Sequence, residues 1–379
     1  MDKHNFDNEA INKHRELKGK IETKSKGSVQ NEDDLSIYYT PGVGAVSKLL
    51  SENPQEARNY TIKSNTVAVV SDGSAVLGLG NIGPEAAMPV MEGKAMLFKD
   101  LADVDAFPIC LDTQDEDEIV LTIKNIAPVF AGVNLEDIAS PKCFEIERRL
   151  QEELDIPVIH DDQHATAIAV LAGLINAIKV TGKDNNNCRV VIVGSGAAGS
   201  GVARLLDKWG IGDIIMVDSK GILSSHRDDL DQNKKNLLKN TNKKDIQGGL
   251  SDAMEGSDIF LGLSQGNLIN AGHISSMNAD PIVFAMANPI PEIEPKIALE
   301  AGAKVVATGR SDYPNQINNV LVFPGMFKGA IATSTKEISD DIKLRAAENL
   351  ASVVEHPTAE KIIPSVFDAG VVESIVSAF

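Results

Sequence analysis

One short glycine-rich segment restricts the possible folds of this chain more than any other feature. Residues 194–199 read Gly-Ser-Gly-Ala-Ala-Gly, directly after the apolar stretch 189–193 and before a segment of helical character at 201–206. A second apolar stretch, 214–218, ends in Asp218. A strand, a glycine turn, a helix and a strand with a terminal carboxylate form the characteristic order of a parallel βαβ unit. The sequence therefore predicts a doubly wound parallel sheet of the Rossmann type in this region.

The same residues predict a dinucleotide site, because each glycine has a physical task there. Gly194 permits the tight turn, Gly196 lets the backbone approach a pyrophosphate, and Gly199 allows close packing of helix on strand. The free N–H groups at the helix start favour phosphate. The predicted cofactor-binding residues of the turn are Gly194, Ser195, Gly196, Ala197, Ala198 and Gly199. The alternative is a glycine turn in a sheet that binds no nucleotide.

Asp218 indicates which dinucleotide is bound. Its carboxylate is placed to accept hydrogen bonds from the ribose hydroxyls, and it would repel a 2′-phosphate. We therefore expect NAD, with NADP as the less favoured acceptor, although Lys220 lies near enough to offset part of the negative charge.

Short apolar stretches elsewhere extend this pattern into two α/β units. Strands are predicted at 66–70, 106–111, 157–160, 189–193, 214–218, 258–261, 282–285 and 304–307, and helices at 115–130 and 163–180. The helix 163–180 would link the two units. We predict an N-terminal arm at 1–30 that contacts a second copy in a dimer, an N-terminal α/β domain at 31–160, a Rossmann-like domain at 161–340, and C-terminal helices at 341–379 that pack on the domains. The alternative for the arm is a solvated segment.

Composition excludes several classes of partner. The net charge is −18 over 379 residues, which disfavours nucleic acid and anionic membranes. The N-terminus has no apolar signal region, the apolar stretches look too short to span a bilayer, and the three cysteines show no pairing pattern. We expect a cytoplasmic protein that binds neither nucleic acid nor membrane. A small anionic substrate would need a metal ion or local positive charge.

Two acidic pairs are candidate metal ligands. Asp161-Asp162 lies between a strand and a helix, where α/β sheets place ligands, and Glu136-Asp137 follows another apolar segment. Three of these carboxylates together would suit Mg²⁺ or Mn²⁺. The alternative for Asp161 and Asp162 is a helix cap with a favourable dipole contact. The neighbouring His160 and His164 are expected outside the metal shell.

A tyrosine and a lysine are weaker candidates when each is considered alone. Tyr39 precedes a Pro-Gly turn, where a tyrosine is more often a packing residue. Lys94 lies in an apolar neighbourhood, where a lysine near a metal can act as a base, but a lysine of this kind is more often a surface residue.

Taken together, these segments resemble those of the malic enzymes, in the same order along the chain. The similarity covers about residues 35–330 and includes segments 39–43, 77–84, 89–94, 134–138, 160–166, 217–221, 287–289 and 318–325. The chain departs from the usual family residues at Glu85, Met88, Ala165 and Ser195.

The resemblance implies roles for particular side chains. It implies that Tyr39 is a general acid, that Lys94 is a general base, and that Asp161 supports the lysine. Glu136, Asp137 and Asp162 would bind the metal. Asn288 and Asn319 would hold the substrate, and Asn288 also the nicotinamide end of the cofactor.

The resemblance also implies an activity and an assembly. The activity is divalent-metal-dependent oxidative decarboxylation of (S)-malate to pyruvate and CO₂ with reduction of NAD, together with decarboxylation of oxaloacetate. The assembly is a homodimer. The alternative function is an oxaloacetate decarboxylase on the same scaffold, but the intact glycine turn and Asp218 argue against it.

Overall fold

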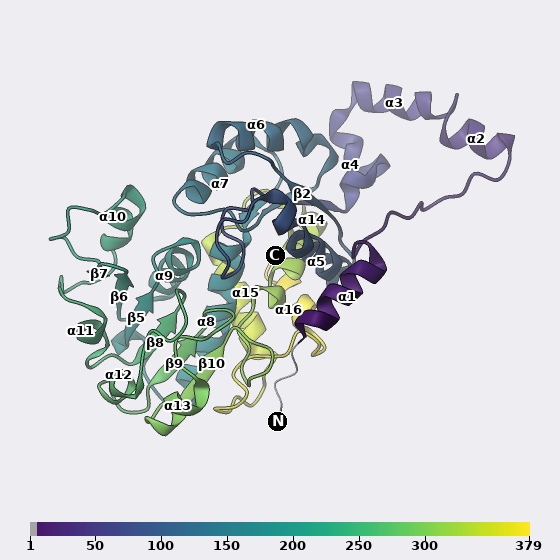
Figure 1. Ribbon diagram of the computed structural model, residues 1–379. Coiled ribbons are helices and arrows are strands. Elements are labelled where there is room, and N and C mark those ends of the chain that lie inside the picture. The colour runs from purple at the N-terminus through teal and green to yellow at the C-terminus, as the bar shows by residue number, and fades with distance from the viewer. Residues whose placement is uncertain (1–5) are drawn as a thin grey trace.

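The computed structural model describes residues 6–379, and these fold around two β-sheets (Figure 1). Residues 1–5 of the predicted arm lie outside the described residues. The sheet orders are β2-β1-β3-β4 and β10-β9-β8-β5-β6-β7. The strands are β1 (Thr66–Ser71), β2 (Asp105–Cys110), β3 (Gly132–Leu135), β4 (Val158–His160), β5 (Arg189–Val193), β6 (Asp213–Asp218), β7 (Gly221–Ile222), β8 (Ile259–Gly262), β9 (Ile282–Ala285) and β10 (Val305–Thr308). The predicted two-unit α/β fold with a parallel Rossmann-like sheet is confirmed.

The N-terminal sheet is covered on both faces, which explains why its strands are continuous apolar runs. Val67 and Val69 of β1 pack in the core that contains α5, whereas Ala68 and Val70 face the opposite core with α6 and α7. The helices are α5 (Pro84–Ala102), α6 (Glu116–Ile126) and α7 (Lys142–Glu153). The helix predicted for 115–130 is thus shorter: Asp115 caps it, and a 3-10 turn that contains Pro128 follows it.

The C-terminal sheet has the same construction. Val190 and Ile192 of β5 face the core shared with α8 and α9, and Val191 and Val193 face the core on the other side. Its helices are α9 (Ala197–Trp209), α10 (Gln232–Leu238), α11 (Leu250–Met254), α12 (Ala271–Ser275) and α13 (Pro295–Glu300). Only β7, a two-residue edge strand, pairs antiparallel.

Helix α8 (Asp161–Thr181) lies between the two sheets and packs against α9 and α15. Our expectation that every apolar stretch is too short for a bilayer is wrong for this helix: among the described residues it alone is long and apolar enough. However, 67% of its most apolar window is buried inside the protein. Because protein surrounds it, its apolar character is that of a core helix.

The C-terminal region packs back on this centre. It contains α14 (Phe323–Thr333), α15 (Asp340–Ser352) and α16 (Val371–Val376), and α15 contacts α8 while α14 contacts α16. Turns that contain Pro357 and Pro364 separate α15 from α16, because proline interrupts a helix.

The N-terminal segment differs from the rest of the molecule. Its helices are α1 (Asp7–Leu17), α2 (Glu32–Tyr38), α3 (Val43–Glu52) and α4 (Ala57–Tyr60), and none of them has a buried residue. Figure 1 shows α2 and α3 projecting from the body, joined to α1 by an extended segment. A bend at Lys26 and Gly27 lies within that extended segment.

Candidate active site

Strand register brings the acidic pairs together. Leu135 of β3 lies opposite His160 of β4 in a parallel ladder. The next residues, Glu136 and Asp161, therefore leave the sheet side by side at its carboxyl end. This is the edge at which open α/β sheets bind ligands.

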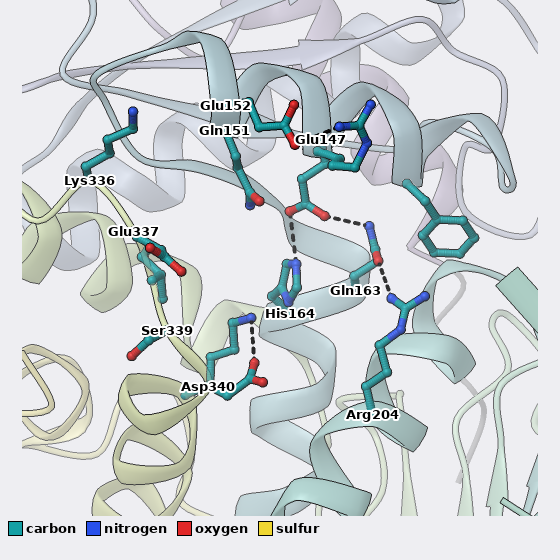
Figure 2. Close-up of a pocket in the computed structure, with 14 residues that line it drawn as sticks. Glu147, Gln151, Glu152, Gln163, His164, Arg204, Lys336, Glu337, Ser339 and Asp340 are labelled. Atoms are coloured by element: carbon teal, nitrogen blue, oxygen red, sulfur yellow. Dashed lines mark hydrogen bonds and ion pairs between the residues drawn. The ribbon is translucent and has the colours of Figure 1, made fainter. Parts of the chain in front are cut away.

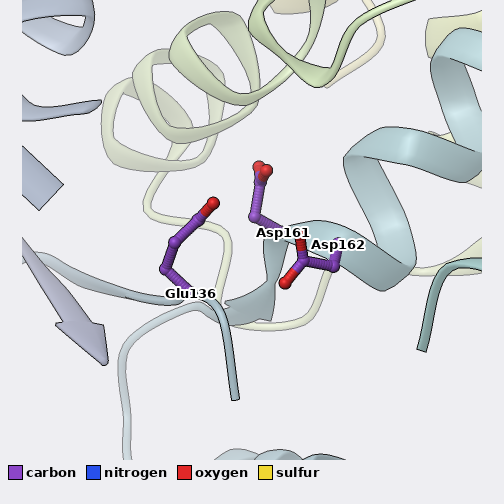
Figure 3. Close-up of side chains that lie close together, drawn as sticks. All are labelled: Glu136, Asp161 and Asp162. Atoms are coloured by element: carbon purple, nitrogen blue, oxygen red, sulfur yellow. The ribbon is translucent and has the colours of Figure 1, made fainter. Parts of the chain in front are cut away.

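Figure 3 shows the side chains of Glu136, Asp161 and Asp162 lying close together. One carboxylate oxygen from each of the three lies within 4.8 Å of the others. Asp137 is not in that convergent trio, but it is buried beside it, and its backbone N–H donates to Asp162 Oδ2 at 3.1 Å. We call Glu136, Asp137, Asp161 and Asp162 the acidic cluster.

Two oxygens of the acidic cluster are buried without a hydrogen-bond partner among residues 6–379: Asp137 Oδ2 and Asp161 Oδ1. An unsatisfied buried carboxylate oxygen is costly. A set of several carboxylate oxygens is the donor type that Mg²⁺ and Mn²⁺ prefer. The residues present therefore fit a hard divalent cation.

Lys94, on α5, is the cation of the acidic cluster. Its Nζ lies 2.7 Å from Asp161 Oδ2 and 2.7 Å from Glu136 Oε1, and it stands 4.3 Å above the centre of the Phe323 ring. Asn319 also donates a hydrogen bond to Asp161 Oδ2. Lys94 is thus buried, and the Asp161 carboxylate orients its ammonium group. The alternative of a surface lysine is wrong, because the Lys94 side chain is 7% exposed.

The acidic cluster carries more negative than positive charge, and the pKa values reflect this. Burial and the neighbouring carboxylates raise the pKa of Asp137 to about 7 and that of Glu136 well above its usual range. Burial alone would lower the pKa of Lys94, but Asp161 and Glu136 more than offset it and raise that pKa above its usual value. Without a further cation, Lys94 is held as an ammonium ion.

The acidic cluster opens into a cavity of about 660 Å³ between the two sheets. Lys94, Glu136, Asp137, Asp162, Asn288 and Asn319 all line it. Asn288 follows β9 and Asn319 precedes α14, so segments distant in sequence supply one site. Of the residues singled out for catalysis, the structure does not bring Tyr39 here: it is 67% exposed, on the projecting segment.

The glycine turn lies beside this cavity, between β5 and α9. Gly194 has a φ of +108°, and a Cβ on Gly199 would come within 1.8 Å of the Gly194 carbonyl oxygen, so both positions require glycine. Gly194 and Ser195 line a second cavity of about 580 Å³, together with Asp218. Ser264 lines both cavities, which makes them neighbours.

Asp218 does not stand alone at the end of β6. Arg227 donates to both of its oxygens at 2.7 and 3.1 Å, and Lys234 donates to Oδ2 at 2.8 Å. Burial alone would raise the pKa of Asp218, but these hydrogen bonds lower it below its usual value. Sequence reasoning noticed Lys220 but missed Arg227 and Lys234, which no motif marks.

A third cavity, of about 730 Å³, lies on the other side of the α8 start (Figure 2). There the buried Glu147 accepts from the backbone N–H of His160 and from Gln163 Nε2, and it contacts His164 Nε2 at 2.9 Å. Glu147, also missed from sequence, therefore fixes the turn that carries Asp161. His160 and His164 lie outside the convergent oxygen trio.

Another missed residue is Asn134, whose Nδ2 donates to Glu136 Oε2 at 2.8 Å. A polar residue inside the buried strand β3 was the available signal.

Comparison with known proteins agrees with this geometry. The family model for the malic enzyme N-terminal domain matches residues 18–151, and that for the malic enzyme NAD-binding domain matches residues 163–377. An NAD-dependent malic enzyme of Geobacillus stearothermophilus is 55% identical over 95% of this chain and 76% of its own length. A bifunctional malic/malolactic enzyme of Bacillus subtilis is 50% identical over 98% of this chain and 91% of its own.

A solved structure gives the same result for the fold. The NAD-dependent malic enzyme of Thermotoga maritima superposes with a TM-score of 0.94 at 48% identity, over 97% of this chain and 98% of the other. The sequence matches, the shared fold and the two adjoining sites together place this chain in the malic enzyme family.

Proposed function

We propose that this protein catalyses oxidative decarboxylation of (S)-malate to pyruvate and CO₂, with reduction of NAD. The observation that carries the proposal is the buried Lys94–Asp161 pair within the acidic cluster, in a cavity that adjoins the glycine turn. In this reaction the C2 hydrogen leaves as a hydride to nicotinamide, the hydroxyl proton leaves to a base, and the C4 carboxylate departs as CO₂. A proton is then added at C3, so that no net proton is consumed.

Glu136, Asp137 and Asp162 would hold Mg²⁺ or Mn²⁺, and Asp161 converges with Glu136 and Asp162 beside Asp137. Two observations support this assignment: the donor atoms are all oxygens, and one buried oxygen each of Asp137 and Asp161 has no hydrogen-bond partner among residues 6–379. When bound, the cation supplies Lewis-acid polarisation at the C2 oxygen and stabilises the charge that remains after CO₂ departs.

Lys94 would accept the proton of the C2 hydroxyl. A base must first be neutral, and the present contacts hold Lys94 as an ammonium ion. Added positive charge among the carboxylates weakens that hold, which brings the lysine closer to a working base. Asp161 and Asn319 fix the direction of Lys94 Nζ and of the carboxylate that faces it.

The cofactor would lie along the carboxyl end of the second sheet. Gly194, Gly196 and Gly199 would receive the pyrophosphate at the start of α9, and Asp218 would bind the adenosine ribose. The nicotinamide end would reach the cavity that Lys94 and Asn288 line. NADP remains the less favoured acceptor. Arg227 and Lys234 are the side chains through which it would be tolerated.

Asn288 and Asn319 would bind the substrate carboxylates beside the acidic cluster.

We further propose that the protein is cytoplasmic and forms a homodimer. The interdomain boundary is placed at the start of α8, near residue 160, with the C-terminal helices beginning near residue 341.

The decisive experiment measures NADH, CO₂, pyruvate and lactate from malate, with and without Mn²⁺. Lactate is included because one relative is named a bifunctional malic/malolactic enzyme. The proposal expects NADH, CO₂ and pyruvate in equal amounts, only with metal. Oxaloacetate consumption without nucleotide, combined with no NADH from malate, would instead favour the decarboxylase alternative. The relatives give that alternative no better support.

A further inference from the structure

The cavity that Lys94 lines also receives a lysine from the N-terminal arm. Lys20 follows α1 closely, and it lines this cavity together with His14 of that helix. No arginine of residues 6–379 lines the cavity. Lys94 is occupied by Asp161 and Glu136, each at 2.7 Å. Because the proposed substrate is a dianion in a site that already contains the acidic cluster, Lys20 is the candidate for a cation that binds a substrate carboxylate.

Local backbone geometry directs Lys20 onto α5, which lies beside α1 (Figure 1). Lys18 and Gly19 have φ values of +57° and +123°, so two successive residues with positive φ end α1 and turn the chain. The backbone N–H of Lys20 then donates to Glu92 Oε2 at 3.2 Å. Its Nζ donates to the carbonyl oxygen of Pro89 at 2.6 Å. These contacts fix both the backbone and the ammonium group of Lys20 against one helix.

The ammonium group of Lys20 lies close to the catalytic stretch of α5 but apart from the acidic cluster. A Cβ added to Gly93, the residue before Lys94, would lie 3.4 Å from Lys20 Nζ. Burial lowers the pKa of Lys20, and Glu92 offsets part of this effect. The pKa of Lys94 responds instead to Asp161 and other members of the acidic cluster. The two lysines therefore share one cavity but have separate charge environments.

Lys20 keeps unused hydrogen-bonding capacity. An ammonium group has three N–H donors. Among residues 6–379, Pro89 supplies the acceptor that is bonded to Lys20 Nζ, and no carboxylate of those residues forms an ion pair with it. Hydrogen bonds between an ammonium group and a carboxylate are among the stronger ones in proteins. Donors thus remain for an anionic ligand in the cavity.

We propose that Lys20 binds the C4 carboxylate of the substrate and makes the site selective for dicarboxylates. This inference rests on the proposed function. Lys94 and the acidic cluster surround the C2 oxygen in the proposed reaction, so a cation that stands apart from them is suited to the far end of malate. Lys20 would supply the charge there, alongside the amides of Asn288 and Asn319.

The contact with Lys20 would act on substrate binding and not on the rate of the chemical step. An ammonium ion stabilises the C4 carboxylate while that group is ionised. The contact is lost as the bond between C3 and C4 breaks and its electron pair moves toward C3. An interaction that is stronger in the bound substrate than in the transition state lowers KM without raising kcat.

Removing the charge while keeping the length of the side chain tests this assignment. Lys20→Met should raise KM for malate about 10–100-fold, as expected for loss of one charge-assisted hydrogen bond, and kcat should not fall. KM for oxaloacetate should rise to a similar degree, because oxaloacetate has the same C4 carboxylate. Pyruvate lacks that group, so its inhibition constant as a product should stay unchanged. Lys20→Arg keeps the cation and should restore most of the malate affinity.

Lys13→Ala is the matched control, because Lys13 is 63% exposed on α1 and does not line the cavity. This variant should have the KM of the wild type. A merely structural role of Lys20 would loosen the arm, and it would then change the KM for NAD and the inhibition by pyruvate as well. An unchanged KM for malate in Lys20→Met, or equal weakening of malate and pyruvate, overturns the proposal.

A titration without turnover separates this inference from the proposed function. Calorimetry measures malate binding to the protein with Mn²⁺ and without nucleotide, and Lys20→Met should weaken that binding about 10–100-fold while pyruvate binding is unchanged. If the wild type binds malate through Lys20 but forms no NADH, the carboxylate site stands and the proposed oxidation fails. Equal malate affinity in the wild type and Lys20→Met, or no malate binding by either, overturns the carboxylate site.

Discussion

The two sheets end in two charged sites of opposite balance. At the end of β3 and β4, the four carboxylates of the acidic cluster surround Lys94, the one lysine that contacts them among residues 6–379. At the end of β6, Asp218 and Asp229 are matched by Arg227, Lys234 and Lys220. Both sites lie at carboxyl ends of strands and both contain tight ion pairs. The charge that remains after pairing differs in sign: it is negative at the acidic cluster and positive at the end of β6.

That remaining charge indicates what each site takes up. A buried site with excess carboxylate is costly until a cation joins it, which agrees with a divalent metal. A site with excess cation at the edge of a nucleotide cavity tolerates phosphate near the ribose. The two sites thus differ in the sign of the charge that their ion pairs leave uncompensated, and this sign indicates the charge of the ligand that each site would attract.

The strongest test of the comparison removes the metal. Excess chelator should abolish malate oxidation, because the acidic cluster would return to its uncompensated state, and Mn²⁺ or Mg²⁺ should restore it. In calorimetric titration, Asp162→Asn should weaken Mn²⁺ binding at least roughly tenfold. Asp155→Asn, a fully exposed acidic residue, is the control and should bind as wild type. Full activity in excess chelator would refute the metal assignment.

The next largest effect should follow loss of Lys94, the cation that contacts the acidic cluster. Lys94→Ala should lower kcat for malate oxidation by about 10²–10⁴-fold, because the hydroxyl proton then has no acceptor. Oxaloacetate decarboxylation should suffer less, since a ketone has no such proton. Lys99→Ala, a surface lysine of the same helix, is the matched control. Near-normal malate oxidation by Lys94→Ala would mean that the base is a different group, with Asp161 the next candidate.

A smaller effect is expected at the opposite site. Asp218→Ala leaves Arg227 and Lys234 without their shared carboxylate, so the ratio of kcat/KM for NADP to that for NAD should rise roughly tenfold or more. Asp213→Ala, at the other end of the same strand, should leave the ratio unchanged. An unaltered ratio in Asp218→Ala would show that this carboxylate does not discriminate between the cofactors.

The sequence predicted those parts of the molecule that depend on local patterns. The apolar run that became β5 and the glycines at 194 and 199 specify their own conformations, and so the Rossmann-like unit was predictable. Gln163 to Val180 was recognised as a helix for the same reason, although its first residues, Asp161 and Asp162, proved to be helical as well.

Other features depend on contacts between distant segments. Arg227 reaches Asp218 across a loop, and Asn319 reaches Asp161 across 158 positions, so no local pattern marks either contact. The projecting position of Tyr39 is also invisible in sequence, where an apolar face looks the same whether its own chain or a second copy covers it.

The smallest predicted effect concerns stability and pH in the acidic cluster. Burial raises the pKa of Asp137 to about 7, above its value in an unfolded chain. Between these two pKa values the folded protein binds more protons than the unfolded chain, so this group's contribution to stability falls as pH rises. In the metal-free protein, the contribution of Asp137 to the free energy of unfolding should therefore fall as the pH rises from about 4 to 7.

Metal binding should reverse that loss, because a cation binds the ionised carboxylate and competes with its proton. Mn²⁺ should raise the Tm by more at pH 7.5 than at pH 5.5, and the comparison within each pH cancels the titration of groups elsewhere. Asp137→Asn removes the titrating carboxyl, so it should reduce the difference between the two Mn²⁺-induced shifts. Asp218→Ala is the control from the opposite site: hydrogen bonds lower the pKa of Asp218, so that carboxyl is already ionised at both pH values, and the difference should persist. Equal shifts at the two pH values in the wild type would mean that the acidic cluster is not the place where protons and metal compete. The contrast between the two sites would then rest on geometry alone.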